Sequence, residues 1–163
     1  MKKQRGLTLY ELLIAMVIAS ILLIAAQATF GNPGIDCKNK HSKPGYVTRA
    51  RIANAQGALG AVYLKVDMFH LWKGRYPTSA DDLKLGNDPW GNPYVFLSFS
   101  DVNGNGPKHK DHNMVPVNKY FDVYSMGPDG KTATPFTSIP GGDDIVIANN
   151  GSYIGVACYH YDK

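Results

Sequence analysis

The stretch RGLTLYELLIAM, residues 5–16, opens an apolar run that extends from Leu7 to Ala26 and contains one charged residue, Glu11. At about 1.5 Å per residue, a helix of this length extends about 30 Å, the thickness of the hydrocarbon core of a membrane. A carboxylate at the centre of a bilayer costs about 2.5–3.5 kcal/mol on insertion scales. A simple anchor gains nothing from that cost, so Glu11 indicates a role beyond anchoring.

The charge distribution separates the N-terminus from the rest of the chain. The formal net charge is +4, from 17 Lys+Arg against 13 Asp+Glu; without Lys2, Lys3 and Arg5 the balance is 14 against 13. The remainder offers no basic stripe, so we expect no nucleic acid contact. Basic residues before an apolar segment stay in the cytoplasm, so we expect the residues after the segment to lie outside it.

The two cysteines, Cys37 and Cys158, then lie in a compartment that permits disulfides. A bridge between them would close a loop of about 120 residues, and the chain-entropy model assigns such a bridge several kcal/mol of stability. The alternative is two unpaired thiols.

Two ordinary interpretations of the N-terminus leave Glu11 without an explanation. A cleaved secretory signal would use the basic start, the apolar core and a signal-peptidase site at Ala26-Gln27-Ala28. A plain membrane anchor is the second possibility. Neither type of segment needs a carboxylate.

A third interpretation accounts for Glu11. Residues 5–11, RGLTLYE, resemble the class III signal of prepilins: a short basic leader, a glycine, an apolar residue, and a glutamate as the fifth residue after the cut. The resemblance implies cleavage after Gly6 by a membrane-embedded peptidase and methylation of the new amine at Leu7. It also implies that Glu11 pairs with such an amine when stems pack into a filament, because a paired carboxylate in an apolar bundle costs much less than an unpaired one.

The sequence therefore divides into four parts. Residues 1–6 are the expected leader, residues 7–30 the hydrophobic stem, residues 31–46 a break, and residues 47–163 a globular domain. The break reads GNPGIDCKNKHSKPG over residues 31–45, and its prolines and glycines end the stem helix. Pilins usually have one long helix from stem into domain, so this chain departs from them here.

A second, amphipathic helix is predicted over about residues 48–72, where a glycine and then a proline follow. Gly57 and Gly60 lie inside it, and close packing against a sheet is the expected reason for them. Its apolar positions recur at helical spacing, at Ile52, Leu59, Val62, Val66 and Phe69.

Four extended segments are predicted in the C-terminal half, at residues 95–99, 120–126, 144–148 and 153–159. A short turn or helix over residues 80–85 precedes them. One amphipathic helix packed on a small antiparallel sheet with long loops, behind a hydrophobic stem helix, is an α+β fold.

The motifs GRYP, DPWGNPY, YFDVYSMGPDG and GGDDI follow in this order over residues 74–145. Together they resemble the major pseudopilin of type II secretion systems, one of the type IV pilin-like proteins. The resemblance implies a pilin-like fold and a structural subunit of the pseudopilus, which drives protein export across the outer membrane. The chain departs from this family at residues 31–45, 102–117 and 132–139 and in the tail with Cys158. A type IV pilus subunit for adhesion, motility or DNA uptake is therefore the alternative.

The resemblance also implies partners and a location. The partners are further copies of the chain in a homopolymeric filament, the prepilin peptidase, an inner-membrane assembly platform and other pilin-like subunits. The subunit is expected in the inner membrane with a periplasmic domain, and then in a periplasmic or extracellular filament.

A calcium site is a further implication of the resemblance, in the loop after the SMGPDG motif. Asp129 matches the aspartate of that motif, and Met126 would contribute its backbone carbonyl. The later ligand matches Asp143 or Asp144, between which the sequence does not decide. Calcium binds six to eight oxygen atoms, which carboxylates and carbonyls of a Gly-rich loop supply. The alternative is that these carboxylates belong to surface turns.

A second calcium candidate lies in DVNGNG. Asp101, Asn103 and Asn105 match the opening of an EF-hand loop, but His112 rather than Glu stands at the twelfth position. A polar hairpin loop is the alternative. His109 and His112, in KHKDH, are expected to be solvated residues of a basic loop rather than zinc ligands.

Catalytic motifs are missing from the sequence, which has no G-x-S-x-G, P-loop or H-E-x-x-H. We therefore expect a structural subunit and not an enzyme. An alternative from another class is a periplasmic calcium-binding module released by signal peptidase. The mature N-terminus distinguishes the two, since it is Leu7 for the filament subunit and Thr29 for the module.

Overall fold

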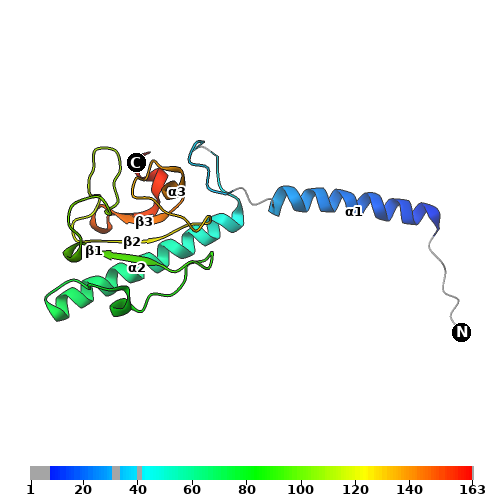
Figure 1. Cartoon of the computed structure of the whole chain (residues 1–163). Coiled ribbons are helices and arrows are strands. Elements are labelled where there is room, and N and C mark those ends of the chain that lie inside the picture. The colour runs from blue at the N-terminus through cyan, green and yellow to red at the C-terminus, as the bar shows by residue number, and fades with distance from the viewer. Residues whose placement is uncertain (1–7, 31–33, 40–41, 163) are drawn as a thin grey trace, which may run out of the picture. The chain divides into compact units, whose positions relative to one another are not determined.

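The structure is a computed structural model that describes residues 8–30, 34–39 and 42–162 (Figure 1). The chain forms two compact units, Met1–Asn32 and Pro33–Lys163. Helix α1, Leu9–Phe30, belongs to the first unit, and helix α2, Tyr46–Lys73, belongs to the second. The described residues between them are not helical. The predicted end of the stem helix before the Gly- and Pro-rich segment is therefore confirmed.

Helix α1 is apolar around its whole circumference. Each side chain from Leu9 to Ile24 is exposed, a pattern typical of a helix that other molecules bury. Within the described residues, no helix reaches both the length and the apolar character of a membrane span. The membrane span expected for residues 7–30 stays a prediction.

Helix α2 packs on the sheet through the apolar stripe predicted from its sequence. Its buried apolar positions are Ala55, Leu59, Val62 and Val66. The helix ends at Gly74, where a φ of +69° is left-handed and the N–H donates to the His70 carbonyl at 2.8 Å. Glycine is the residue that adopts this C-terminal cap without steric cost.

The expectation that close packing against the sheet requires Gly57 and Gly60 inside α2 is wrong. Gly57 is exposed, and a Cβ built on it would meet no atom of a neighbouring residue within 4 Å. A Cβ on Gly60 would lie 3.7 Å from Ile154 Cδ1, which is an ordinary contact. Packing therefore requires glycine at neither position.

Four strands form one antiparallel sheet in the order β1-β2-β3-β4, with α2 lying along one face (Figure 1). The strands are β1 Val95–Ser98, β2 Phe121–Ser125, β3 Ile145–Ala148 and β4 Tyr153–Val156. The predicted α+β fold is confirmed. The fourth strand is shorter than predicted, because a 3-10 helix begins at Ala157 and continues to Asp162.

The face of the sheet away from α2 is also covered, which explains why β3 is buried along its whole length. The two segments that depart from the pseudopilin pattern, residues 102–117 and 132–139, contribute to this second core. Its buried members are Val117, Phe136, Val146, Ala148, Tyr153 and Ala157. The departures from the family pattern are therefore part of the folded core.

Cys37 and Cys158 form the predicted disulfide, with their Cα atoms 5.7 Å apart. A short helix that the sequence did not predict, α3 Ile139–Gly142, lies beside the bridge. A Cβ on Gly142 would come within 3.0 Å of Cys37 Sγ. The bridge thus ties the segment 34–39 to α3 and to the C-terminal 3-10 helix.

Candidate functional site

The predicted processing motif lies at the start of the first unit. Gly6 and Leu7, the predicted cleavage site, lie outside the described residues. Thr8 and Glu11 form a reciprocal capping box. The N–H and the hydroxyl of Thr8 donate to Glu11 Oε2 at 2.9 and 2.8 Å, and the Glu11 N–H donates to the Thr8 hydroxyl oxygen at 3.3 Å. The spacing T-x-x-E is the sequence signal for this arrangement, which the predictions for Glu11 did not include.

The acidic residues proposed as calcium ligands lie in the connection between β2 and β3. Asp144 is fully buried, and Thr132 Oγ1 donates to its Oδ2 at 2.6 Å. Oδ1 of Asp144 and Oδ1 of Asp143 are both buried without a hydrogen-bond donor among the described residues. Asp129 is exposed, and its Oδ1 accepts the Lys131 N–H at 2.8 Å.

Burial favours the neutral form of two of these carboxyls, those of Asp143 and Asp144. Burial, with the nearby charge of Asp129, raises the pKa of Asp143 to about 6. Burial, with the charges of Asp143 and Asp129, raises the pKa of Asp144 to about 8. The physical cause is that desolvation and like charges both penalise a carboxylate. A cation bound between these groups would remove the penalty.

Gly127 brings the two ends of this connection together. Its φ is +64°, and a Cβ built on it would lie 2.4 Å from the Asp143 carbonyl oxygen. No other residue fits such a position without moving the backbone. The main chain directly after Met126, the predicted carbonyl ligand, therefore runs against Asp143.

The DPWGN turn supports the same loop. Asp88 is buried, and its Oδ1 accepts the N–H groups of Trp90 and Asn92 at 3.0 and 2.8 Å. Its Oδ2 accepts the Ser125 hydroxyl at the end of β2. The side-chain amide of Asn92 donates to the Gly127 carbonyl at 3.0 Å. Two motifs that are distant in the sequence therefore form one hydrogen-bonded unit.

The donor chemistry of this loop fits calcium. Within the described ranges, no three acidic, histidine or cysteine side chains gather closely enough to hold a metal by themselves. The donors on offer are carboxylate and backbone carbonyl oxygens, which calcium prefers and takes in flexible geometry. A calcium ion here would need backbone carbonyls to complete its ligand shell.

The second calcium candidate lies on the surface. Asp101, Asn103 and Asn105 are all exposed. Asp101 Oδ1 accepts the Ser100 hydroxyl at 3.2 Å, and Asn105 Oδ1 accepts the Lys108 ammonium at 3.4 Å. The calcium role of these residues stays a prediction.

The expectation that His109 is solvated is wrong. Its side chain is buried, and its ring lies 4.4 Å from the Tyr124 ring and 5.4 Å from the Phe136 ring, between centroids. Its backbone N–H donates to Asp122 Oδ2 at 2.8 Å. The reason is that His109, Asp111 and Val117 of this segment are buried against the sheet, while residues 103–107 and 112–115 are exposed.

Asp111 joins two histidines that are far apart in the sequence. Its Oδ1 lies 2.7 Å from Nδ1 of His112, which is exposed as expected. Its Oδ2 lies 2.7 Å from Nδ1 of His160, and this second pair is buried. The pair attaches the C-terminal 3-10 helix to the segment 102–117. No local sequence motif predicts the contact between Asp111 and His160.

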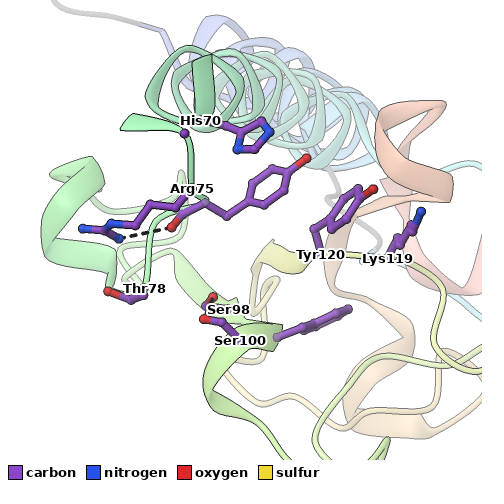
Figure 2. Close-up of a pocket in the computed structure, with 10 residues that line it drawn as sticks. His70, Arg75, Thr78, Ser98, Ser100, Lys119 and Tyr120 are labelled. Carbon is purple, nitrogen blue, oxygen red and sulfur yellow. Dashed lines mark hydrogen bonds between the residues drawn. The ribbon is translucent and has the colours of Figure 1, made fainter. Parts of the chain in front are cut away.

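A cavity of about 470 Å³ lies near the end of α2 and is drawn in Figure 2. The Tyr76 ring stacks on His70 and on Tyr120, with centroids 4.1 and 4.6 Å apart. Arg75 donates to the Tyr76 carbonyl at 3.3 Å, and Lys119 Nζ lies 5.0 Å from the Tyr120 ring centroid. Both cations are therefore partnered within the described chain, and we assign no ligand to this cavity.

Comparison with known proteins gives one family model and three relatives. The prokaryotic N-terminal methylation motif matches residues 1–27. The type II secretion system core protein G of Pseudomonas aeruginosa is 28% identical over 155 residues, which cover 80% of this chain and 87% of the relative. The core protein G of Klebsiella pneumoniae is 27% identical over 154 residues, 80% of this chain and 89% of the relative. The core protein G of Aeromonas hydrophila is 27% identical over 156 residues, which cover 82% of this chain and 89% of the relative. No solved structure matches the chain significantly.

Proposed function

We propose that this chain, a type IV pilin-like protein similar to core protein G of type II secretion systems, is a structural subunit of a pseudopilus that drives protein export across the outer membrane. The observation that carries the proposal is the methylation motif at residues 1–27 joined to similarity over 80% of the chain. The role is structural rather than enzymatic.

The stem provides the chemistry of assembly. The exposed apolar surface of α1 is one that neighbouring stems would bury in a filament. Cleavage after Gly6 creates a cationic amine at Leu7. Glu11 then neutralises such an amine, its own or that of a neighbouring subunit. The capping box with Thr8 supports this order of events, because it keeps the carboxylate hydrogen-bonded before a neighbour arrives.

The same proposal gives partners and a location. The subunit first lies in the inner membrane through residues 7–30, with its globular unit in the periplasm, and then joins a periplasmic or extracellular filament. Its partners are the prepilin peptidase, an inner-membrane assembly platform, other pilin-like subunits and further copies of itself.

Calcium binding belongs to the proposal as well. Asp129 and either Asp143 or Asp144 would hold the ion together with backbone carbonyls such as that of Met126, because the acidic side chains of the described residues alone do not gather closely enough. The ion supplies the positive charge that the buried carboxylates lack. The unpaired buried oxygens of Asp143 and Asp144 support this role, as does the hydrogen bond by which Asn92 holds the loop.

The mature N-terminus tests the proposed function. The chain is produced with a prepilin peptidase, and the N-terminal peptide is analysed by mass spectrometry. We expect a methylated Leu7, and a Gly6→Leu variant should stay uncleaved as the control. An N-terminus at Thr29 would support the periplasmic module released by signal peptidase and overturn the filament proposal.

Loss of the gene in its host separates the pseudopilus from a type IV pilus. If the chain is a pseudopilus subunit, we expect loss of the gene to stop the export of secreted proteins across the outer membrane. Normal export with loss of surface fibres would support the pilus subunit instead.

A further inference from the structure

A cavity of about 250 Å³ adjoins the acidic loop. Its lining includes Asp36, Cys37 and Lys38 from the segment 34–39, which we call the bridged segment. It also includes Asp129 and Asp143, two of the proposed calcium ligands. The bridged segment therefore brings an additional carboxylate and an additional cation to the cavity beside the proposed ion.

Two attachments hold the bridged segment at this cavity. Ile35 packs against the core between α2 and the sheet, and Cys37 is bonded to Cys158. The bridge lies directly against the residue before Asp143, since a Cβ on Gly142 would meet Cys37 Sγ at 3.0 Å. The disulfide therefore limits how far the bridged segment can move from Asp143.

The turn within the bridged segment orients Asp36. Its Oδ1 accepts the backbone N–H groups of Lys38 and Asn39, each at 3.0 Å. This is an Asx turn, which fixes the aspartate side chain on its own backbone. Both Asp36 and Lys38 are exposed, so their charges act on the cavity across solvent and not as a buried pair.

We propose that the bridged segment forms part of the wall of the calcium site. In this wall, Asp36 strengthens calcium binding and the Cys37–Cys158 disulfide holds Asp36 in place. The inference rests on the proposed calcium role of Asp129 and Asp143. Lys38 on the same wall opposes binding by its positive charge. Two charges of opposite sign, two residues apart, thus have opposite effects on calcium affinity, which a merely structural segment would not produce.

Isothermal titration calorimetry with calcium chloride, on the full chain in detergent micelles with the bridge oxidised, tests the charges. We expect Asp36→Asn to weaken calcium binding by about threefold to tenfold and Lys38→Gln to strengthen it by about twofold to fivefold. Asp81→Asn and Lys65→Gln make the same charge changes at exposed positions that do not line this cavity, and they should leave the affinity unchanged. Unchanged affinity in Asp36→Asn overturns the proposal.

A double-mutant cycle tests the role of the disulfide. Removing the bridge with Cys37→Ser and Cys158→Ser should weaken binding by no more than Asp36→Asn does, because Lys38 is released together with Asp36, and the triple variant should be no weaker than Asp36→Asn. Full additivity of the two effects overturns the positioning role. If the variant without the bridge lacks a cooperative thermal transition, the opposite shifts of Asp36→Asn and Lys38→Gln with the bridge intact decide the matter.

An Asp129→Asn variant separates this inference from the calcium proposal beneath it. Loss of binding in Asp129→Asn together with unchanged binding in Asp36→Asn overturns the bridged segment alone. A wild-type chain that binds no calcium overturns both proposals.

Discussion

Glu11 has one partner in the isolated chain and a different one in the proposed filament. In the isolated chain, the N–H and hydroxyl of Thr8 satisfy its carboxylate. In a bundle of stems, the amine at Leu7 would offer a full charge in a medium of low dielectric, where a charged partner is worth more than a neutral one. Under the proposed function, the residue would therefore serve the start of the helix first and assembly afterwards.

Two variants separate these roles. Glu11→Gln keeps a side-chain oxygen for Thr8 but has no charge, so we expect folded protein and a filament yield reduced about tenfold or more. Thr8→Ala keeps the charge and loses the cap, which costs about 1 kcal/mol at the helix start, so its filament yield should fall less. Sheared filaments are measured by immunoblot and electron microscopy. Normal yield from Glu11→Gln would contradict charge pairing.

Replacing glycine by alanine is expected to have opposite effects on stability at Gly127 and at Gly57. At Gly127, a Cβ would collide with the Asp143 carbonyl and φ is positive, so Gly127→Ala should destabilise the chain by about 1–3 kcal/mol. At the exposed, helical Gly57 a Cβ meets nothing within 4 Å, so Gly57→Ala should stabilise it by about 0.5–1 kcal/mol. Thermal unfolding in detergent, followed by circular dichroism, measures both. Equal melting temperatures for the two variants would contradict the backbone geometry.

At the scale of elements, the connection between β2 and β3 holds two buried carboxyl oxygens without a hydrogen-bond donor among the described residues, Oδ1 of Asp143 and Oδ1 of Asp144. Its ends meet at Gly127 and Asp143, and the turn that begins at Asp88 holds it from one side. The elements around it are regular, and their bounds agree with the sequence pattern to within a few residues. The loop's own geometry depends on hydrogen bonds between motifs that are distant in the sequence, which periodicity does not predict.

The buried carboxyls make stability depend on pH in the absence of calcium. The folded-state pKa values of about 6 for Asp143 and about 8 for Asp144 lie above the ordinary value of 3.8. The folded chain therefore binds protons more tightly than the unfolded chain, and the free energy of unfolding falls as pH rises through these values. We expect the melting temperature in chelator to fall between about pH 5 and about pH 8.

Calcium and one substitution provide the controls for this prediction. Calcium added at the higher pH should restore the melting temperature, and Asp144→Asn should flatten the pH dependence in chelator, because its amide does not ionise. A melting temperature in chelator that stays constant over this pH range would contradict the assignment of these carboxyls as buried and unpaired.

At the scale of the whole molecule, the globular unit has a core on each face of its sheet. The core under α2 follows from an amphipathic helix. The second core is built by the segments 102–117 and 132–139 and by the 3-10 helix that begins at Ala157. The disulfide adds a covalent link across this unit, with a sequence separation of 121.

Removing that link should destabilise the globular unit substantially. For a loop of this length, the chain-entropy model gives about 4–5 kcal/mol for the combined Cys37→Ser and Cys158→Ser variant. Urea unfolding of the oxidised chain against the variant measures the difference in the free energy of unfolding. Reductant should lower the stability of the wild type and leave that of the variant unchanged. A difference below about 1 kcal/mol would mean that noncovalent contacts already hold the bridged segment.

The sequence by itself determined the elements of this protein: a stem that ends at a Gly- and Pro-rich break, an amphipathic helix, four short strands and a single possible disulfide. It also predicted a processing motif before Glu11. These features follow from local periodicity, turn residues and residue counts, all of which are properties of the sequence alone. Tertiary structure alone decided that His109 is buried, that Asp111 meets His160, and that Asp36 shares a cavity with Asp143. Such contacts join residues that are distant in the sequence, and they exist only once the sheet, its covering segments and the bridge have packed together.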